Sequence, residues 1–272
     1  MKFVALLSGG KDSCYNVVKC TQHGHTLVCL ANLHPPDDFV GEEMDSFMYQ
    51  SAAHSTIPVL AECFGVPLIR QPITGGAVNQ ALDYLHPQPA DEVEDLFYLL
   101  QRVKEAYPDC QGVSCGAILS TYQRLRVEHV CARLQMTVLS YLWMRNRRSL
   151  LTEMVRGGGG GQGQGQDQGQ SMGGQGCGVD AVLVKVAGAG LVPHKHLGHS
   201  LSHLYPQLLH LHRRFGLDLC GEGGEYETLV LDCAAFMRRL VLGTSEVVLD
   251  GENEEVGNLK INDAYSVEKG GT

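Results

Sequence analysis

The chain has 272 residues, of which 44% are hydrophobic and 19% are charged, a composition suited to one large or two modest globular domains. Its 30 acidic and 21 basic residues give a net charge of -9, which argues against a nucleic-acid partner that needs a broad basic surface. The apolar runs are far shorter than the roughly 20 residues of a membrane helix, so we expect neither a membrane partner nor a secretory signal.

Short apolar stretches alternate with helical patterns over the first 143 residues. The pattern predicts strands at 3–7, 26–32, 66–72, 112–119 and 137–142, and helices at 12–21, 48–64, 91–107 and 122–134. Pro58 is expected to kink or break the helix over 48–64. The alternation predicts an α/β fold with a doubly wound, mostly parallel sheet that helices cover on both faces. Ligands of such sheets bind beyond the carboxyl ends of the strands.

The second half of the chain has a different pattern. It predicts a helix over 147–156, a strand over 179–186, a His-rich helical stretch to about residue 215 and a strand over 229–231. We therefore expect an α/β domain over 1–134 and a smaller α+β domain over 135–249. Residues 250–272 are polar and contain several glycines, which predicts a disordered tail.

Two compositional features bear on the organisation and the setting of the protein. Of the 33 glycines, 12 fall within residues 157–178, so this Gly/Gln-rich segment is predicted to be a flexible insertion in the second domain. The ten cysteines are scattered, and no two of them form a Cys-x-x-Cys pair. Several lie in apolar stretches, where a reduced cysteine behaves as a small hydrophobe. We therefore predict a reducing, cytoplasmic setting.

A polar loop follows the first predicted strand and opens the first predicted helix. It consists of Ser8, Gly9, Gly10, Lys11, Asp12 and Ser13. The unpaired N–H groups and the positive dipole end of the helix face such a turn and favour an anion. The glycines permit close approach to the backbone, while the lysine and the serines supply a charge and hydroxyl donors. The spacing differs from that of a Walker A loop, since position 5 is alanine and Lys11 precedes aspartate.

Polar residues also follow the fourth predicted strand and open the helix after it. The segment contains Gly116, Ser120, Tyr122, Gln123, Arg124 and Arg126, which are expected to bind the nucleotide that the family resemblance given below implies. The carboxyl ends of parallel strands meet at one sheet edge, so the two arginines are expected to reach a nucleotide at the 8–13 loop.

Acidic residues gather at two further places. The helix over 91–107 opens with Glu92, Glu94 and Asp95, a distribution that favourable interaction with the helix dipole largely explains. The second place is more distinctive and consists of Gly221, Glu222, Gly223, Gly224, Glu225, Tyr226, Glu227 and Thr228. We interpret it as a tight, negatively charged loop in which the Tyr226 ring attracts a quaternary ammonium group. We predict substrate-binding residues in both segments: Glu92, Glu94, Asp95, Glu222, Gly223, Gly224, Glu225, Tyr226 and Glu227.

The 8–13 loop resembles the PP-loop of the N-type ATP pyrophosphatases, and all these segments in this order resemble the diphthine–ammonia ligase family. The resemblance covers about residues 1–250 apart from the Gly/Gln-rich segment, and Thr121 stands where relatives often have aspartate. It implies that ATP and Mg²⁺ are used to amidate diphthine on translation elongation factor 2 with ammonium. The products would be diphthamide, AMP and pyrophosphate, formed through an acyl-adenylate. Catalytic roles are then expected for Lys11, Asp12 and Ser13, with Asp12 as a magnesium ligand.

Three other functions remain open at this point. The first is a PP-loop enzyme that modifies a tRNA base. Such enzymes that carry sulfur or an iron–sulfur cluster rely on positioned cysteines, and in this sequence only Cys110 and Cys115 form a near pair. A small-molecule amidotransferase and a non-catalytic nucleotide-binding module are the others. The histidines at 196, 199 and 203 have helical spacing but lack accompanying cysteine or carboxylate ligands, so we interpret them as a solvated or packed helix face.

Overall fold

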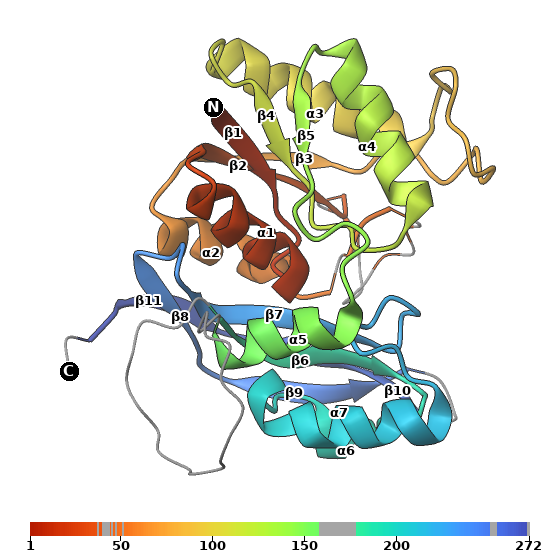
Figure 1. Cartoon of the computed structure of the whole chain (residues 1–272), viewed down its shortest axis with the longest axis vertical. Coiled ribbons are helices and arrows are strands. Elements are labelled where there is room, and N and C mark those ends of the chain that lie inside the picture. Colours follow the sequence, from red (N-terminus) through yellow and green to blue (C-terminus); the bar gives the residue numbers. More distant parts are fainter. Residues whose placement is uncertain are drawn as a thin grey trace.

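A five-stranded parallel sheet forms the centre of the N-terminal half (Figure 1). The computed structural model describes residues 1–36, 38–39, 44, 46, 48–50, 52–157, 178–250 and 255–270. The strands of the sheet are β1 (Lys2–Leu6), β2 (Thr26–His34), β3 (Leu68–Pro72), β4 (Gly112–Ser114) and β5 (Thr137–Leu139). Their order is β3-β2-β1-β4-β5. The chain leaves β1 toward one edge and returns to β4 on the other side of it, so a topological switch point lies between β1 and β4.

Helices cover both faces of this sheet. On one face lie α1 (Lys11–Gln22) and α2 (Ile57–Phe64), and on the other lie α3 (Glu92–Ala106) and α4 (Thr121–Arg133) (Figure 1). The last two begin at side-chain caps, since Asp91 accepts the N–H of Val93 and Ser120 accepts that of Gln123. The predicted doubly wound α/β fold is therefore confirmed.

The C-terminal half adds an antiparallel sheet and three helices. The sheet has the order β7-β6-β10-β9 and consists of β6 (Val179–Ala187), β7 (Tyr226–Cys233), β9 (Ser245–Leu249) and β10 (Val256–Ile261). A separate pair contains β8 (Arg238–Leu242) and β11 (Ala264–Glu268). The helices are α5 (Arg147–Arg156), α6 (Pro193–His196) and α7 (Leu201–Phe215). The smaller second unit therefore has the predicted α+β character.

The prediction of a disordered tail over 250–272 is wrong for residues 255–270, the part of the tail that the structure describes beyond Asp250. Within it, β10 pairs with β6 and β9, and β11 pairs with β8. Leu259 of β10 is buried and lies opposite Val247 of β9. Short polar strands of this kind gain their order from partners distant in the sequence, which local composition does not reveal.

Several predicted elements have different bounds in the structure, and among them the strand predicted over 137–142 ends at Leu139. The helix predicted over 48–64 reduces to a 3₁₀ turn (His54–Thr56) followed by α2, and Pro58 lies in the first turn of α2, where proline is tolerated. The strand predicted over 112–119 ends at Ser114. The strand predicted over 229–231 begins earlier, at Tyr226. The last three residues of the predicted acidic loop are therefore part of β7.

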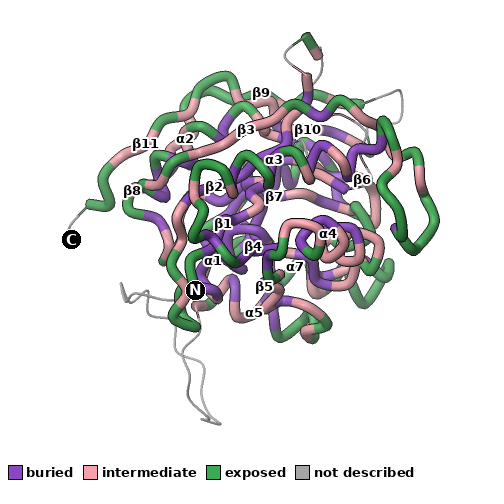
Figure 2. Tube along the Cα trace, turned by 90° about the horizontal axis from the view of Figure 1, so that it is seen from above, coloured by how far each residue is buried: buried purple, intermediate pink, exposed green. Residues whose placement is uncertain are grey.

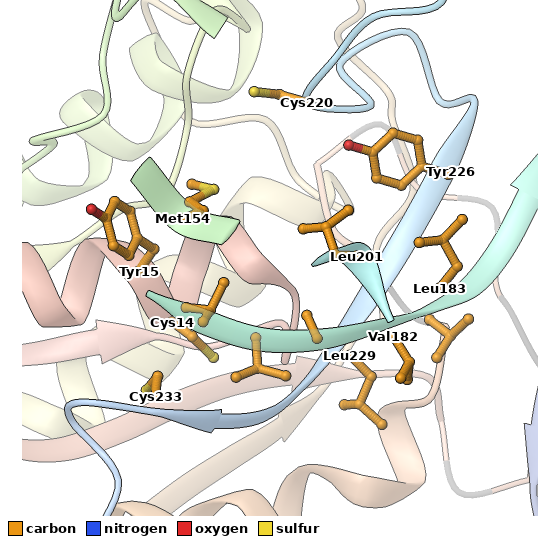
Figure 3. Packing of buried hydrophobic residues seen from close by; sticks show 14 of the residues in the cluster. Cys14, Tyr15, Met154, Val182, Leu183, Leu201, Cys220, Tyr226, Leu229 and Cys233 are labelled. Atoms are coloured by element: carbon orange, nitrogen blue, oxygen red, sulfur yellow. The ribbon is translucent and has the colours of Figure 1, made fainter. Parts of the chain in front are cut away.

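The two sheets share one hydrophobic core. A single cluster joins α1 and α2 to β6 and β7, and Figure 3 shows Cys14 of α1 next to Cys233 of β7. The tube in Figure 2 is buried along β4 and over most of β1 and β7, which lie at the centre of the molecule. The second sheet consequently packs against the helix that begins at the 8–13 loop.

Two further predictions concern the Gly/Gln-rich segment and the lack of a membrane-spanning helix. Apart from Gly157 and Gly178, the predicted insertion over 157–178 lies outside the described residues. Among the described residues, no helix has both the length and the apolar character needed to cross a membrane.

Glu153 of α5 links this helix to α1. It accepts hydrogen bonds from the hydroxyl of Tyr15 at 2.6 Å and from Arg145 at 2.7 Å, and it pairs with Lys19. Burial disfavours the charge on Glu153, but the donors on Arg145, Lys19 and Tyr15 outweigh burial and lower its pKa to about 2. A carboxylate with a lowered pKa stabilises the folded state above its unfolded pKa of 4.5, and this contribution is lost as the pH falls toward 2.

We therefore expect Glu153→Gln to lower the free energy of unfolding most at pH 7 and progressively less as the pH falls from about 5 to 3. Urea unfolding of both proteins at several pH values measures this difference. Glu105→Gln on the exposed face of α3 is the control, for which we expect a small and nearly constant difference. A difference between wild type and Glu153→Gln that stays constant with pH would contradict the prediction.

Candidate active site

The 8–13 loop lies at the carboxyl end of β1, at the switch point between β1 and β4. Gly9 has a φ of 86°, a conformation that favours glycine, and the loop passes directly into α1 at Lys11. The hydroxyls of Ser8 and Ser13 lie 3.2 Å apart, and that of Ser8 accepts the Gly10 N–H at 3.3 Å. The predicted anion-binding geometry, a tight turn before a helix N-terminus, is therefore present.

Gly116 allows the loop after β4 to lie against the first turn of α1. A Cβ atom at this position would lie 2.7 Å from the backbone nitrogen of Ser13 and 2.8 Å from the carbonyl carbon of Asp12. These are backbone atoms, so no side-chain movement relieves the clash. The loop after β4 and the first turn of α1 can therefore lie this close together only because residue 116 is glycine.

Lys11 is enclosed by residues of the C-terminal half. Its ammonium donates a 2.8 Å hydrogen bond to Asp12 and another to the carbonyl of Cys220, and it lies 5.2 Å from the centre of the Tyr226 ring. The lysine is 3% exposed. Burial disfavours its charge, but Asp12, Tyr226 and Cys220 together outweigh burial and raise the pKa of Lys11 above its usual range. Lys11 therefore remains a cation throughout the neutral pH range.

Asp12 has one carboxylate oxygen in use and one free. Oδ2 accepts the Lys11 hydrogen bond, while Oδ1 is buried and has no hydrogen-bond partner among the described residues. Burial raises the pKa of Asp12, although Lys11 opposes this effect. A buried carboxylate oxygen without a partner at an anion site suits an oxygen-coordinated cation such as Mg²⁺.

A cavity of about 560 Å³ opens at the carboxyl ends of β1, β2 and β4. One part of its wall is apolar and consists of Leu6, Leu7, Ala31, Leu33, Leu96, Leu99 and Val127. Another part is polar and includes eleven of the predicted site residues: Ser8, Lys11, Asp12, Ser13, Gly116, Ser120, Gln123, Glu222, Gly224, Tyr226 and Glu227. The structure thus brings together segments from both halves of the chain around one cavity.

Arg124 and Arg126 do not line this cavity. Arg124 donates to Glu128 at 2.6 Å and lies over the Trp143 ring. Arg126 is fully buried and donates to the carbonyls of Asn79 at 2.6 Å and Ala81 at 2.9 Å. The structure therefore gives no support to the prediction that the two arginines reach the nucleotide.

Tyr122 packs against Arg126 and is not part of the cavity wall. The guanidinium of Arg126 stacks on the Tyr122 ring, 3.3 Å from its centre, and the Tyr122 hydroxyl donates to the carbonyl of Asn79 at 3.2 Å. Both side chains consequently hold the loop that precedes α3 against α4.

The acidic residues at the start of α3 are also engaged away from the cavity. Glu94 pairs with Arg133 through two 2.9 Å hydrogen bonds, and Asp95 accepts the backbone N–H groups of Thr74 and Gly75. Glu92 accepts a 2.6 Å hydrogen bond from Ser46, which does line the cavity. These carboxylates fix loops around the cavity, so the substrate-binding role predicted for them lacks a geometric basis.

In the 221–228 segment, the side chains of Glu225 and Tyr226 contact groups of the chain itself, in place of the predicted substrate. Glu225 accepts the N–H groups of Asp218 at 2.7 Å and Gly223 at 3.0 Å, so it stabilises its own turn. Tyr226 is 2% exposed, its hydroxyl donates to the carbonyl of Leu219 at 2.6 Å, and its ring lies beside the ammonium of Lys11. The cation next to Tyr226 is thus a lysine of the chain, in place of the substrate group that we expected.

Glu222 and Glu227 remain as the acidic residues that line the cavity from this segment. Glu222 accepts the N–H of Leu119 at 3.0 Å and so bridges to the loop after β4. Burial and the nearby Asp12 raise the pKa of Glu222. Glu227 lies 3.9 Å from Lys185, a second lysine of the cavity wall.

Sequence reasoning assigned no role to three residues of this site. Thr228 was recognised as part of a motif but assigned no role, although its hydroxyl accepts the Lys11 N–H at 3.0 Å. Gln50 donates to the carbonyl of Thr228 at 3.2 Å, and Lys185 lies in the cavity wall. The position of Gln50 in the sequence gives no sign of this contact, because its partner is 178 residues away.

The histidines and cysteines do not form a metal centre in the described part of the chain, where no group of three His, Cys, Asp or Glu side chains could hold a metal ion. His196 is buried and contacts Val192 and Gln207. Burial raises the pKa values of Cys110 and Cys115, which makes them poor nucleophiles.

Comparison with known proteins gives consistent matches over both halves of the chain. The family model of the diphthamide synthase N-terminal domain matches residues 1–138, and that of the diphthamide synthase C-terminal domain matches residues 178–269. Seven similar proteins carry the name diphthine–ammonia ligase, among them proteins of zebrafish, human and fission yeast. The zebrafish (Danio rerio) protein is 43% identical over 99% of this chain and 98% of its own length. The human (Homo sapiens) protein is 44% identical over 92% of this chain and 85% of its own length.

The third relative is a longer protein. The fission yeast (Schizosaccharomyces pombe) protein is 48% identical over 96% of this chain, but the match spans only 39% of its own length. The similarity thus covers nearly the whole of this chain and only part of the yeast protein.

Proposed function

The chain belongs to the diphthamide synthase family, and we propose that it is an ATP-dependent diphthine–ammonia ligase. The reaction joins ammonium to the carboxylate of diphthine, on translation elongation factor 2, and releases AMP and pyrophosphate. The observation that carries the proposal is the buried Lys11 at the N-terminus of α1, on the wall of a 560 Å³ cavity that both halves of the chain line.

ATP fits the two kinds of wall that the cavity offers. The apolar side chains from β1, β2, α3 and α4 suit the adenine ring, and the 8–13 loop suits the phosphates. Hydroxyls of Ser8 and Ser13 and the ammonium of Lys11 would bind the pyrophosphate that leaves when the diphthine carboxylate attacks the α-phosphorus. Asp12 fits a magnesium ion through its free Oδ1, and such an ion would neutralise charge on the phosphates of ATP.

The second step needs an amine and the exclusion of water. A carboxylate is a poor electrophile, so its conversion to an acyl-adenylate precedes attack by ammonia, and AMP then leaves. Glu222 and Glu227 place negative charge in the part of the wall contributed by the C-terminal half. We assign these two carboxylates, in place of the Tyr226 ring, to the trimethylammonium group of diphthine or to the incoming ammonium.

The setting of the reaction follows from the substrate and from the cysteines. A modified translation factor is a cytoplasmic protein, and the nine cysteines among the described residues are all free thiols in buried positions. Both features support the prediction of a reducing, cytoplasmic environment.

The proposal is tested by measuring AMP release from ATP with elongation factor 2 that carries diphthine. We expect AMP only when ATP, the modified factor and ammonium are all present, together with conversion of the diphthine carboxyl group to an amide detected by mass spectrometry. Elongation factor 2 without diphthine is the control. AMP formation that does not depend on the modified factor, or that depends on tRNA instead, would refute the proposal.

A further inference from the structure

The N-terminus of α1 has an unusual cap. The N-cap residue is Gly10, which has no side chain to accept a hydrogen bond, whereas Ser120 and Ser200 cap α4 and α7 with their own hydroxyls. The Lys11 N–H is instead accepted at 3.0 Å by the hydroxyl of Thr228, 217 residues further along the chain. A residue of the second sheet thus supplies the cap that the 8–13 loop lacks.

The alternation of side chains along β7 explains this contact. Tyr226 and Thr228 are two residues apart, so their side chains lie on the same face of the strand, and both are 2% exposed. On that face the Thr228 hydroxyl contacts the backbone of Lys11, while the Tyr226 ring lies beside its ammonium. Further along the strand, the N–H of Val230 donates to the carbonyl of Gly9 at 2.9 Å.

These contacts hold the loop at successive points. The carbonyl of Thr228 also accepts a hydrogen bond from Gln50, whose own oxygen lies 3.5 Å from the hydroxyl of Ser8. Strand β7 is therefore bonded to Gly9 and Lys11 directly and to Ser8 through Gln50. The PP-loop is fixed from outside its own domain.

We propose that Thr228 is a positioning residue for the phosphate-binding loop. Its hydroxyl fixes the backbone of Lys11, and this holds the lysine side chain and the loop hydroxyls where charge develops on the departing pyrophosphate. Donors that are already in place need no reorganisation during the reaction, so a small displacement reduces the rate more than it weakens ground-state binding. The inference rests on the proposed function, since it assigns Thr228 a task in that reaction.

Two substitutions at this position separate the hydroxyl from the shape of the side chain. Thr228→Val keeps the shape but leaves the Lys11 N–H buried without an acceptor, and Thr228→Ser keeps the hydroxyl. With the full chain, we expect Thr228→Val to lower kcat for AMP formation about tenfold and to raise the Kd for ATP about threefold. We expect Thr228→Ser to stay within about twofold of wild type in both measurements.

A matched control removes a helix cap elsewhere in the C-terminal half. Ser200→Ala deletes the hydroxyl that accepts the His203 N–H at the start of α7, outside the cavity wall. Urea unfolding of all three variants measures their stability. We expect Ser200→Ala to lose stability as Thr228→Val does but to keep wild-type kcat and Kd.

Three outcomes would overturn the inference. One is a Thr228→Val protein with wild-type kcat and Kd, a second is a Thr228→Ser protein as impaired as Thr228→Val, and a third is an equal loss of activity in Ser200→Ala. If the wild-type chain forms no AMP with diphthine-bearing elongation factor 2, the proposed function fails instead. In that case the Kd for ATP, measured by equilibrium dialysis across the same variants, still decides whether Thr228 positions the loop.

Discussion

Replacing Lys11 with methionine is expected to lower kcat/KM for AMP formation by about 10²- to 10³-fold, the loss typical of removing one donor that stabilises developing negative charge. Methionine keeps much of the length of lysine and none of its charge. Lys11 is the only residue of the 8–13 loop with a positive side chain, and neighbouring charges keep it protonated at neutral pH. The effect should therefore be nearly independent of pH between about 6 and 9.

The same substitution has a second consequence that must be separated from the first. Loss of the ammonium leaves the Asp12 carboxylate without its partner in a largely enclosed site, which destabilises the folded protein. The double variant Lys11→Met with Asp12→Asn removes this uncompensated charge. We expect it to recover much of the stability but none of the activity.

Stability is measured by urea unfolding and activity by AMP release with saturating protein substrate. Lys2→Met is the control, since Lys2 is an exposed lysine paired with Asp109 at the opposite end of β1. A double variant that regained wild-type activity together with its stability would show that Lys11 acts only in folding.

The first part of the site could be predicted because its determinants are adjacent in the sequence. A buried strand, a turn with two glycines and a helix start with lysine and serine all lie within the first 13 residues. The anion-binding geometry follows from the helix N-terminus itself and needs no distant contact. The parallel sheet could be predicted for a similar reason, since each strand and helix has its own local pattern.

Other features depend on contacts that the sequence does not record. Arg124 and Arg126 are the same residue type, but two positions apart on α4 they face different directions. The buried one, Arg126, donates to carbonyls of the loop that precedes α3. Tyr226 lines the cavity, but only the structure shows that its ring lies beside the ammonium of Lys11. Strands β10 and β11 escaped prediction because their partners lie in other parts of the chain.

The cap at Thr228 shows why the two halves of the sequence cannot be interpreted separately. Residues 8–13 appear complete as an anion site, and the later acidic segment appears to be a separate substrate loop. In the structure, Thr228 of β7 accepts a hydrogen bond from the backbone N–H of Lys11, and Cys220 in the turn before β7 accepts one from its ammonium. Binding of the protein substrate next to Glu222 and Glu227 would thus take place against the same strand that holds the phosphate-binding loop.

Replacing Asp12 with asparagine is expected to remove most of the effect of Mg²⁺ on ATP binding. Asparagine has nearly the same shape and retains one oxygen, but it lacks the charge that a divalent cation favours. In wild type the buried Oδ1 of Asp12 has no hydrogen-bond partner among the described residues, so it is free to bind a cation. We expect the Mg²⁺ concentration for half-maximal AMP formation to rise about tenfold or more in the variant.

Equilibrium dialysis with ATP, in the presence of either Mg²⁺ or a chelator, tests this expectation without relying on activity. The wild-type protein should bind ATP more tightly with Mg²⁺ than with the chelator, and the Asp12→Asn protein should show little difference between the two conditions. Asp109→Asn is the control, because it makes the same chemical change at an exposed carboxylate outside the cavity wall. Since Lys11 is unchanged in Asp12→Asn, an undiminished effect of Mg²⁺ on its ATP affinity would mean that Asp12 serves only to hold the lysine, and that the cation binds through the phosphates of ATP alone.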